Sequence, residues 1–114
     1  MTESHIFITT QDHPVGYTIT ATHGLVRGNT VRSRNLGSNF LSGLKTMVGG
    51  EITGLTKLIT ESRDEAVDRL IDHAKEQGAN AVVGMRFITT EVGASCSEIL
   101  AYGTAVTISK NTES

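Results

Sequence analysis

A cluster of arginines in the first third of the chain is the strongest candidate for ligand chemistry. Arg32 and Arg34 fall on the same side of an extended segment, just before a predicted helix, and Arg27 lies in the same stretch. Guanidinium groups bind phosphate and carboxylate groups through paired hydrogen bonds, and the start of a helix adds backbone N–H donors. Glu51 follows a glycine pair and would form a second wall. We therefore predict that Arg32, Arg34 and Glu51 bind a small anionic ligand.

These arginines have an alternative role, which is to pair with acidic side chains of the same or a neighbouring subunit. The acids concentrate on one predicted helix, at Glu61, Asp64, Glu65, Asp68, Asp72 and Glu76. Arg86 interrupts a strand pattern that is otherwise mainly apolar. We expect Arg86 to reach a carboxylate at an interface or to line a central opening, and we include it among the candidate ligand-binding residues.

The residues that bind soft metals are sparse. Such ions need thiolate, imidazole or thioether ligands that converge on one point. The chain has one cysteine, Cys96, and four histidines, with no Cys-x-x-Cys and no His-x-x-x-His spacing. Cys96 is predicted in a hairpin loop, where a single thiolate is a weak ligand. One interpretation is that Cys96 is an ordinary loop cysteine. The alternative is that symmetry-related Cys96 side chains, helped by Met85 or a histidine, hold a heavy metal ion.

Sequence signatures of enzymes are missing. There is no Gly-x-Ser-x-Gly segment and no cysteine with a histidine close by in the sequence, which argues against a nucleophilic hydrolase. Gly49-Gly50-Glu51 lacks the Lys-Ser or Lys-Thr ending of a phosphate loop. We expect a non-enzymatic protein. A small enzyme acting at Arg32, Arg34 and Glu51 stays open as a second alternative.

Composition indicates a single domain of residues 1–114, with an ordered core at 5–109. The formal net charge of −2 provides no basic surface for nucleic acid. One cysteine excludes an internal disulfide and is typical of a reducing cytoplasm. No signal peptide is visible, and no apolar stretch approaches the ~20 residues that span a bilayer. We expect a cytoplasmic protein that binds neither nucleic acid nor membranes.

The first half of the chain predicts two strands and a short helix. His5–Thr10 is rich in residues that favour strands. The stretch from Gly16 to Val26 alternates between two faces, which favours a half-exposed strand with a bend or bulge near Gly24. Apolar residues from Leu36 to Val48 then recur at helical spacing until two glycines end the pattern.

The second half predicts a long helix and two strands. An apolar stripe runs at helical spacing from Ile52 to Ala74, and we expect one continuous helix that stops at Gly78. Ala81–Val92 and Glu98–Ile108 are the predicted strands, joined by a hairpin loop. The order β-β-α-α-β-β indicates an α+β domain, with two helices on one face of a mainly antiparallel sheet.

The final strand is apolar or small on both faces. In the strand before it, simple alternation places Val83, Met85 and Phe87 on one face. Two helices cover only one face of a four-stranded sheet, so apolar surface is left over. We expect identical copies of the chain to cover it in a homo-oligomer.

Four segments carry a family resemblance. They are Val31-Arg32-Ser33-Arg34, Val48-Gly49-Gly50-Glu51-Ile52, Gly78-Ala79-Asn80-Ala81-Val82-Val83-Gly84 and Tyr102-Gly103-Thr104-Ala105-Val106. In this order and spacing they resemble the YbjQ-like family of small uncharacterised prokaryotic proteins. The resemblance implies an α+β subunit that assembles into a closed pentameric ring with a barrel-like sheet core. The family also carries a heavy-metal-binding label, and the resemblance implies no established enzymatic activity.

Together these observations predict a non-enzymatic homo-oligomer that binds a small anionic ligand at its subunit interfaces. The alternatives are a heavy-metal-binding protein using symmetry-related Cys96 and a small enzyme.

Overall fold

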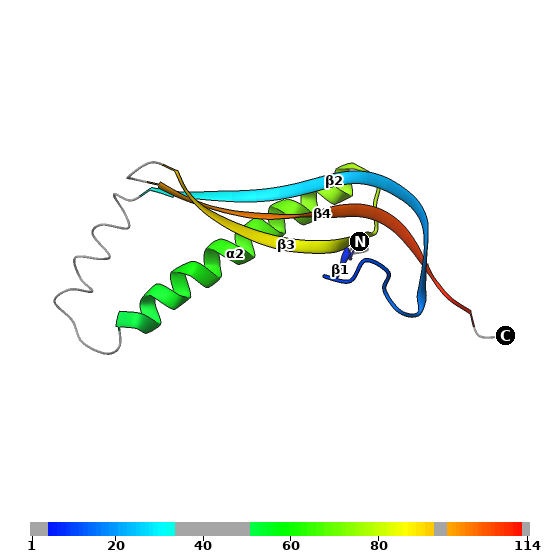
Figure 1. Cartoon of the computed structure of the whole chain (residues 1–114), viewed down its shortest axis with the longest axis horizontal. Helices are drawn as coiled ribbons and strands as arrows, with labels where there is room; N and C mark the ends of the chain where they lie inside the picture. The colour runs from blue at the N-terminus through cyan, green and yellow to red at the C-terminus, as the bar shows by residue number, and fades with distance from the viewer. Residues whose placement is uncertain (1–4, 34–50, 93–95, 113–114) are drawn as a thin grey trace.

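The computed structural model describes residues 5–33, 51–92 and 96–112. These residues form one helix and four strands (Figure 1), which are β1 (Phe7–Ile8), β2 (Tyr17–Ser33), α2 (Glu51–Glu76), β3 (Ala81–Val92) and β4 (Cys96–Lys110). α2 is continuous, as predicted, and β3 has the predicted bounds. β2 and β4 run further than predicted. The helical pattern predicted from Leu36 to Val48 lies outside the described residues.

A single mixed sheet holds the strands in the order β1-β3-β4-β2. β4 pairs antiparallel with β2 on one side and with β3 on the other, whereas β1 pairs parallel with the start of β3. α2 lies across one face of this sheet, over β2 and β4. The predicted α+β class and mainly antiparallel sheet are therefore confirmed.

The contact between α2 and the sheet is unusually close at one glycine. Ala66, Leu70 and Ala74 are fully buried and share a core with Val26. A Cβ atom on Gly28 would lie 2.2 Å from the Ala66 carbonyl oxygen and 2.3 Å from the Leu70 backbone nitrogen. Gly28 thus lets the helix backbone rest directly on β2, which continues through this position.

Gly78 ends α2 as predicted, with a positive φ of 82°. The Ala79 N–H donates to the Ala74 carbonyl at 3.1 Å, and the Gly78 N–H donates to the Lys75 carbonyl at 3.0 Å. This pair of bonds is the Schellman arrangement, which satisfies the last helix carbonyls. Ala79 and Ala74 are also both buried in the same core, which fixes the angle at which the chain leaves the helix.

The side-chain amide of Asn80 makes the pair of hydrogen bonds to β4 that a backbone peptide group would make. Its Nδ2 donates to the Ile108 carbonyl at 3.0 Å, and its Oδ1 accepts from the Ile108 N–H at 2.8 Å. The Asn80 backbone also takes part, because its N–H donates to the Val106 carbonyl at 3.1 Å. The Gly78-Ala79-Asn80 segment therefore has a structural role, which is to turn the chain from α2 into β3.

A β-bulge in β3 changes the predicted assignment of faces. Val83 pairs with Thr104, but the next pair is Arg86 with Tyr102, so Gly84 and Met85 together oppose Gly103. The extra residue shifts the alternation, and Gly84 takes a positive φ of 63° to allow it. Phe87 therefore lies on the α2 side of the sheet, whereas Val83 lies on the opposite side. The prediction that Val83, Met85 and Phe87 share one face was wrong.

Two further differences concern the ends of strands. The predicted bend near Gly24 is present as a register shift between Thr22 and Gly24, where φ is 123°. The predicted hairpin loop from Gly93 to Glu98 is too long, because β4 begins at Cys96, which pairs with Val92 and with Ser33. The polar residues at this end fit a strand because Glu98 finds a cross-strand partner in Asn29.

Candidate functional site

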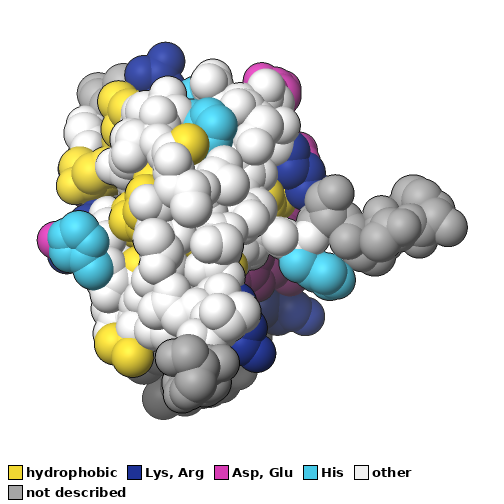
Figure 2. Space-filling view, turned by 90° about the vertical axis from the view of Figure 1, so that its right-hand side faces the viewer, with side chains coloured by type: hydrophobic (Ala, Val, Ile, Leu, Met, Phe, Trp, Pro, Cys, Tyr) yellow, Lys and Arg dark blue, Asp and Glu magenta, His cyan; other side chains and the backbone are white. Residues whose placement is uncertain are grey.

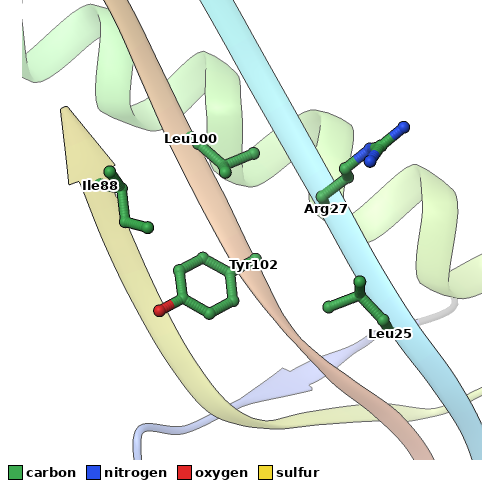
Figure 3. Close-up of a pocket in the computed structure, with 5 residues that line it drawn as sticks. All are labelled: Leu25, Arg27, Ile88, Leu100 and Tyr102. Atoms are coloured by element: carbon green, nitrogen blue, oxygen red, sulfur yellow. The ribbon is translucent and has the colours of Figure 1, made fainter. Parts of the chain in front are cut away.

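A shallow hollow lies on the sheet face opposite α2. It has a volume of about 310 Å³ and is lined by Leu25, Arg27, Ile88, Leu100 and Tyr102. The lining residues come from β2, β3 and β4. Figure 3 shows the three aliphatic side chains and the tyrosine ring around the hollow, while the guanidinium of Arg27 points away from them, past β2. The site is an apolar surface with a cationic group at its rim.

Large apolar side chains around this hollow are open to solvent. Leu25 is 66% exposed, Val31 57% and Ile88 45%. The strands lie in front of α2 in Figure 1, so that view looks onto this uncovered face. Figure 2, which views the molecule from one end, shows hydrophobic side chains gathered on one flank and most of the charged side chains on the other. We call the surface formed by Leu25, Val31, Ile88, Leu100 and Tyr102 the open face.

A polar pair lies within the open face, between Leu100 and Val31. The Asn29 Nδ2 donates to Glu98 Oε2 at 2.8 Å, and the pair is partly buried. The Arg27 guanidinium, in contrast, makes no hydrogen bond or ion pair within the described part of the chain. A positive charge that pairs with no other described residue therefore stands at the rim of an apolar surface.

Arg86 lies on the same side of the sheet and makes hydrogen bonds within its own subunit. Its Nη1 donates to the Thr10 carbonyl at 3.0 Å and to the Met85 carbonyl at 2.9 Å. These bonds tie the segment after β1 to the bulge of β3. The guanidinium remains exposed, so Arg86 fastens the N-terminal segment while keeping donors available to solvent.

The other predicted anion ligands are not brought together by the described structure. Arg32 belongs to β2 and pairs with Ser97, and Glu51 is the first residue of α2. The side chains of Arg32 and Glu51 lie outside the described residues, as does all of Arg34. The predicted site at these three residues therefore stays a prediction.

Comparison with known proteins identifies the family. A profile for YbjQ proteins, described as "Putative heavy-metal-binding", matches residues 6–109. The match covers nearly the entire chain and agrees with the resemblance carried by its four segments. The chain belongs to the YbjQ family.

Curated relatives of this YbjQ chain share its length and about half of its residues. A UPF0145 protein of Saccharolobus islandicus is 48% identical over 109 residues, which is 96% of each chain. A UPF0145 protein of Streptomyces griseus is 51% identical over 105 residues, covering 92% of this chain and 86% of the relative. A UPF0145 protein of Methanococcus vannielii is 51% identical over 102 residues, covering 90% and 97%.

A solved structure shows the same fold. A protein of unknown function from Pediococcus pentosaceus, assigned to the DUF74 family, superposes with a TM-score of 0.59 and 21% identity. The superposition covers 91% of this YbjQ chain and 98% of that protein. Within the described residues, no helix is sufficiently long and apolar to cross a bilayer.

The heavy-metal label of the YbjQ family can be tested against the donors of the described residues. No group of three or more His, Cys, Asp or Glu side chains comes together among them. Met85 packs against the buried core, and the Cys96 side chain lies outside the described residues, although its backbone begins β4. The described donors of one subunit therefore do not fit a soft-metal centre.

The two described histidines closest to other polar groups have structural partners. His23 Nε2 lies 2.7 Å from Thr107 Oγ1, across the pair of β2 and β4. His73 Nδ1 accepts from the Arg27 N–H at 3.1 Å, which joins α2 to β2. Both contacts join elements of the fold.

The open face itself was only partly visible in the sequence of this YbjQ protein. The alternation of β4 places Leu100 and Tyr102 on one face, so this part of the open face follows from the sequence. Leu25 and Ile88 were not recognised as site residues, because their side of the sheet depends on the register shifts in β2 and β3. A bulge is set by long-range pairing and cannot be read from a strand taken alone.

Proposed function

We propose that this YbjQ protein is a non-enzymatic subunit of a closed homo-oligomer that binds a small anionic ligand where its copies meet. The open face would be buried against neighbouring copies. The resemblance to the family favours a ring of five subunits. The observation that carries the proposal is the exposed apolar surface of the sheet, with an arginine at its rim.

The energetics of the open face favour burial. Each fully buried Leu, Val or Ile side chain contributes about 1.5–3 kcal/mol relative to exposure. Leu25, Val31 and Ile88 lie on the same face of the sheet, and between 45% and 66% of each residue is exposed to water. Interfaces commonly combine an apolar centre with Tyr and Arg, and Tyr102 and Arg27 fit that composition.

The shape and the core of one subunit also favour assembly into an oligomer. The radius of gyration is 17.8 Å, whereas a compact chain of this length would have about 13 Å. The largest fully buried side chains among the described residues are Leu70, Val26, Val82, Val106 and Ser62, and none is aromatic. An elongated subunit with a core of small side chains gains much of its stability from contact with other copies.

The oligomer is tested by placing a charge on the open face. We expect the native protein to sediment as a multiple of its 12.2 kDa subunit, and Leu25→Asp to shift the population to the single subunit. A carboxylate at this position would have to be buried without a partner. Analytical ultracentrifugation at several protein concentrations measures both species.

Val15→Asp is the matched control. Val15 is 86% exposed and lies outside the open face, in the turn before β2, so the same substitution should leave the mass unchanged. A native protein that sediments as a single subunit at micromolar concentration would overturn the proposed oligomer.

The ligand is tested with octanoate, which combines an apolar chain with a carboxylate. We expect Arg27→Gln to weaken octanoate binding by about tenfold, since a charge-assisted hydrogen bond contributes about 1.5–3 kcal/mol. Isothermal titration calorimetry measures the affinity, and Arg63→Gln, an exposed arginine on α2, is the control. Equal binding by the native protein and Arg27→Gln would remove Arg27 from the site.

A further inference from the structure

His73 of α2 lies against the outer edge of β2, at the strand residue whose side chain stands at the rim of the hollow. Its Nδ1 is 3.1 Å from the Arg27 backbone nitrogen and 3.3 Å from the Arg27 carbonyl oxygen. β2 is the last described strand on this side of the sheet, so the imidazole covers backbone groups that no further described strand pairs with. The helix on the face opposite the hollow therefore brings a polar ring to the border of the candidate site.

The contact with β2 determines which nitrogen of the neutral imidazole carries the proton. The Arg27 N–H needs an acceptor, and Nδ1 provides one in the shorter of the two contacts. A neutral imidazole has one donor and one acceptor nitrogen, so Nε2 carries the proton when Nδ1 accepts. Within the described part of the chain, no group accepts a hydrogen bond from His73 Nε2. The ring therefore has one unused donor.

This donor and the Arg27 guanidinium both project from the β2 edge. The two nitrogens of an imidazole lie on either side of a ring carbon, so the Nε2–H is directed away from the strand backbone when Nδ1 contacts it. Figure 3 shows the guanidinium of Arg27 pointing past β2, away from the aliphatic side chains of the hollow. Because His73 is bonded to the same residue that carries this guanidinium, one anion at the edge can contact both groups.

The charges around the β2 edge favour one kind of anion. Arg69, one turn before His73 on α2, already has a partner, because its Nη2 lies 3.1 Å from Glu65 Oε2. The Arg27 guanidinium has no partner among the described residues. Glu76 lies one turn after His73 on the same helix and would repel multiply charged groups. The edge therefore suits a singly charged carboxylate.

We propose that the His73 Nε2–H and the Arg27 guanidinium together bind the carboxylate of an amphipathic ligand, whose apolar chain lies in the hollow. Leu25 of β2 and Leu100 of β4 supply aliphatic surface for that chain. The two oxygens of a carboxylate accept hydrogen bonds from two donors at once. The inference rests on the proposed function in that Arg27 binds the ligand, and it adds a second donor from the other layer of the fold.

Two substitutions of His73 separate its contact with β2 from its contact with the ligand. Asparagine places its amide near the position of Nδ1 and has no group at that of Nε2, whereas glutamine places its amide near Nε2 and leaves the Nδ1 position empty. We expect His73→Asn to keep the native urea midpoint and to weaken octanoate binding by about two- to tenfold, the effect of one lost hydrogen bond. His73→Gln should lower the urea midpoint and retain more of the affinity.

Isothermal titration calorimetry measures the octanoate affinity of both variants. His23→Asn is the matched control, because His23 is also exposed but contacts Thr107, and its replacement should leave octanoate binding unchanged. Equal affinity of the native protein and His73→Asn would overturn the inference.

Nitrogen NMR of the imidazoles provides a readout that a purely structural histidine would not change. In alkaline buffer, where imidazole is neutral, the His73 ring should show a protonated Nε2 and an unprotonated Nδ1. The His73 signals are those that disappear in His73→Asn. Acetate, a carboxylate without the apolar chain, should shift the His73 Nε2 signal in the native protein but not in Arg27→Gln, and should leave the His23 signals in place.

The outcomes distinguish this inference from the function on which it rests. If octanoate binding depends on Arg27 but acetate leaves the His73 Nε2 signal in place, the role of His73 is wrong and the proposed function stands. If octanoate does not bind but acetate gives a shift that depends on Arg27, the pair of donors is supported and the apolar chain in the hollow is wrong.

Discussion

Replacing Gly28 by alanine should separate α2 from the sheet and give the largest loss of stability of any single methyl group added at a described glycine. The new Cβ would fall 2.2 Å from the Ala66 carbonyl oxygen, 2.3 Å from the Leu70 nitrogen and 2.8 Å from the Arg69 carbonyl carbon. All three atoms belong to the helix backbone, which cannot rotate away as a side chain does. Overpacking usually costs about 1–3 kcal/mol, and we expect this substitution to reach or exceed the upper end.

The experiment is urea unfolding at fixed protein concentration, followed by circular dichroism. Gly28→Ala combined with Ala66→Gly should be no more stable than Gly28→Ala alone, because the clash is with the backbone of residue 66 and not with its methyl group. Full recovery of stability in the double variant would show that the contact is made by side chains, contrary to the structure.

Leu70→Ala should give the second large effect. Leu70 is the largest fully buried side chain among the described residues, and it joins α2 to the core around Val26. Truncation leaves a cavity and removes apolar burial, which together cost about 2–5 kcal/mol. Since a domain of this kind is stable by about 5–15 kcal/mol, the variant should unfold at a clearly lower urea concentration.

Ile59→Ala is a suitable comparison for Leu70→Ala. Ile59 lies on the same helix and has a similar volume, but it is 38% exposed. We expect its truncation to cost clearly less than the truncation of Leu70. Equal losses for the two variants would mean that burial along α2 is not distributed as described.

The local elements of this fold follow from the sequence more readily than their arrangement. The helical spacing from Ile52 to Ala74 and the glycine at 78 identify α2, because both signals depend on neighbouring residues. Gly28 lies beyond Val26, where the predicted strand ends, and its lack of a side chain serves the contact with α2. That role depends on a residue distant in sequence and has no local signature.

The candidate site, too, follows only in part from the sequence, because it depends on contacts between distant residues. Both faces of β4 were recognised from alternation, which led directly to the expectation of assembly. The order β1-β3-β4-β2, the parallel pairing of β1 and the bulge at Gly84 and Met85 depend on long-range hydrogen bonds. Without them, Leu25 and Ile88 could not be assigned to the face that carries Tyr102.

The side-chain amide of Asn80 helps to determine which face of the sheet is buried against α2. In a strand, a slip of one residue exchanges every side chain between the two faces. Such a slip of β4 would turn Leu100 and Tyr102 toward the helix and Ala101 and Ala105 outward. The two hydrogen bonds between the Asn80 side chain and Ile108 form in only one register of β4. A single carboxamide therefore specifies which face of β4 lies toward the helix.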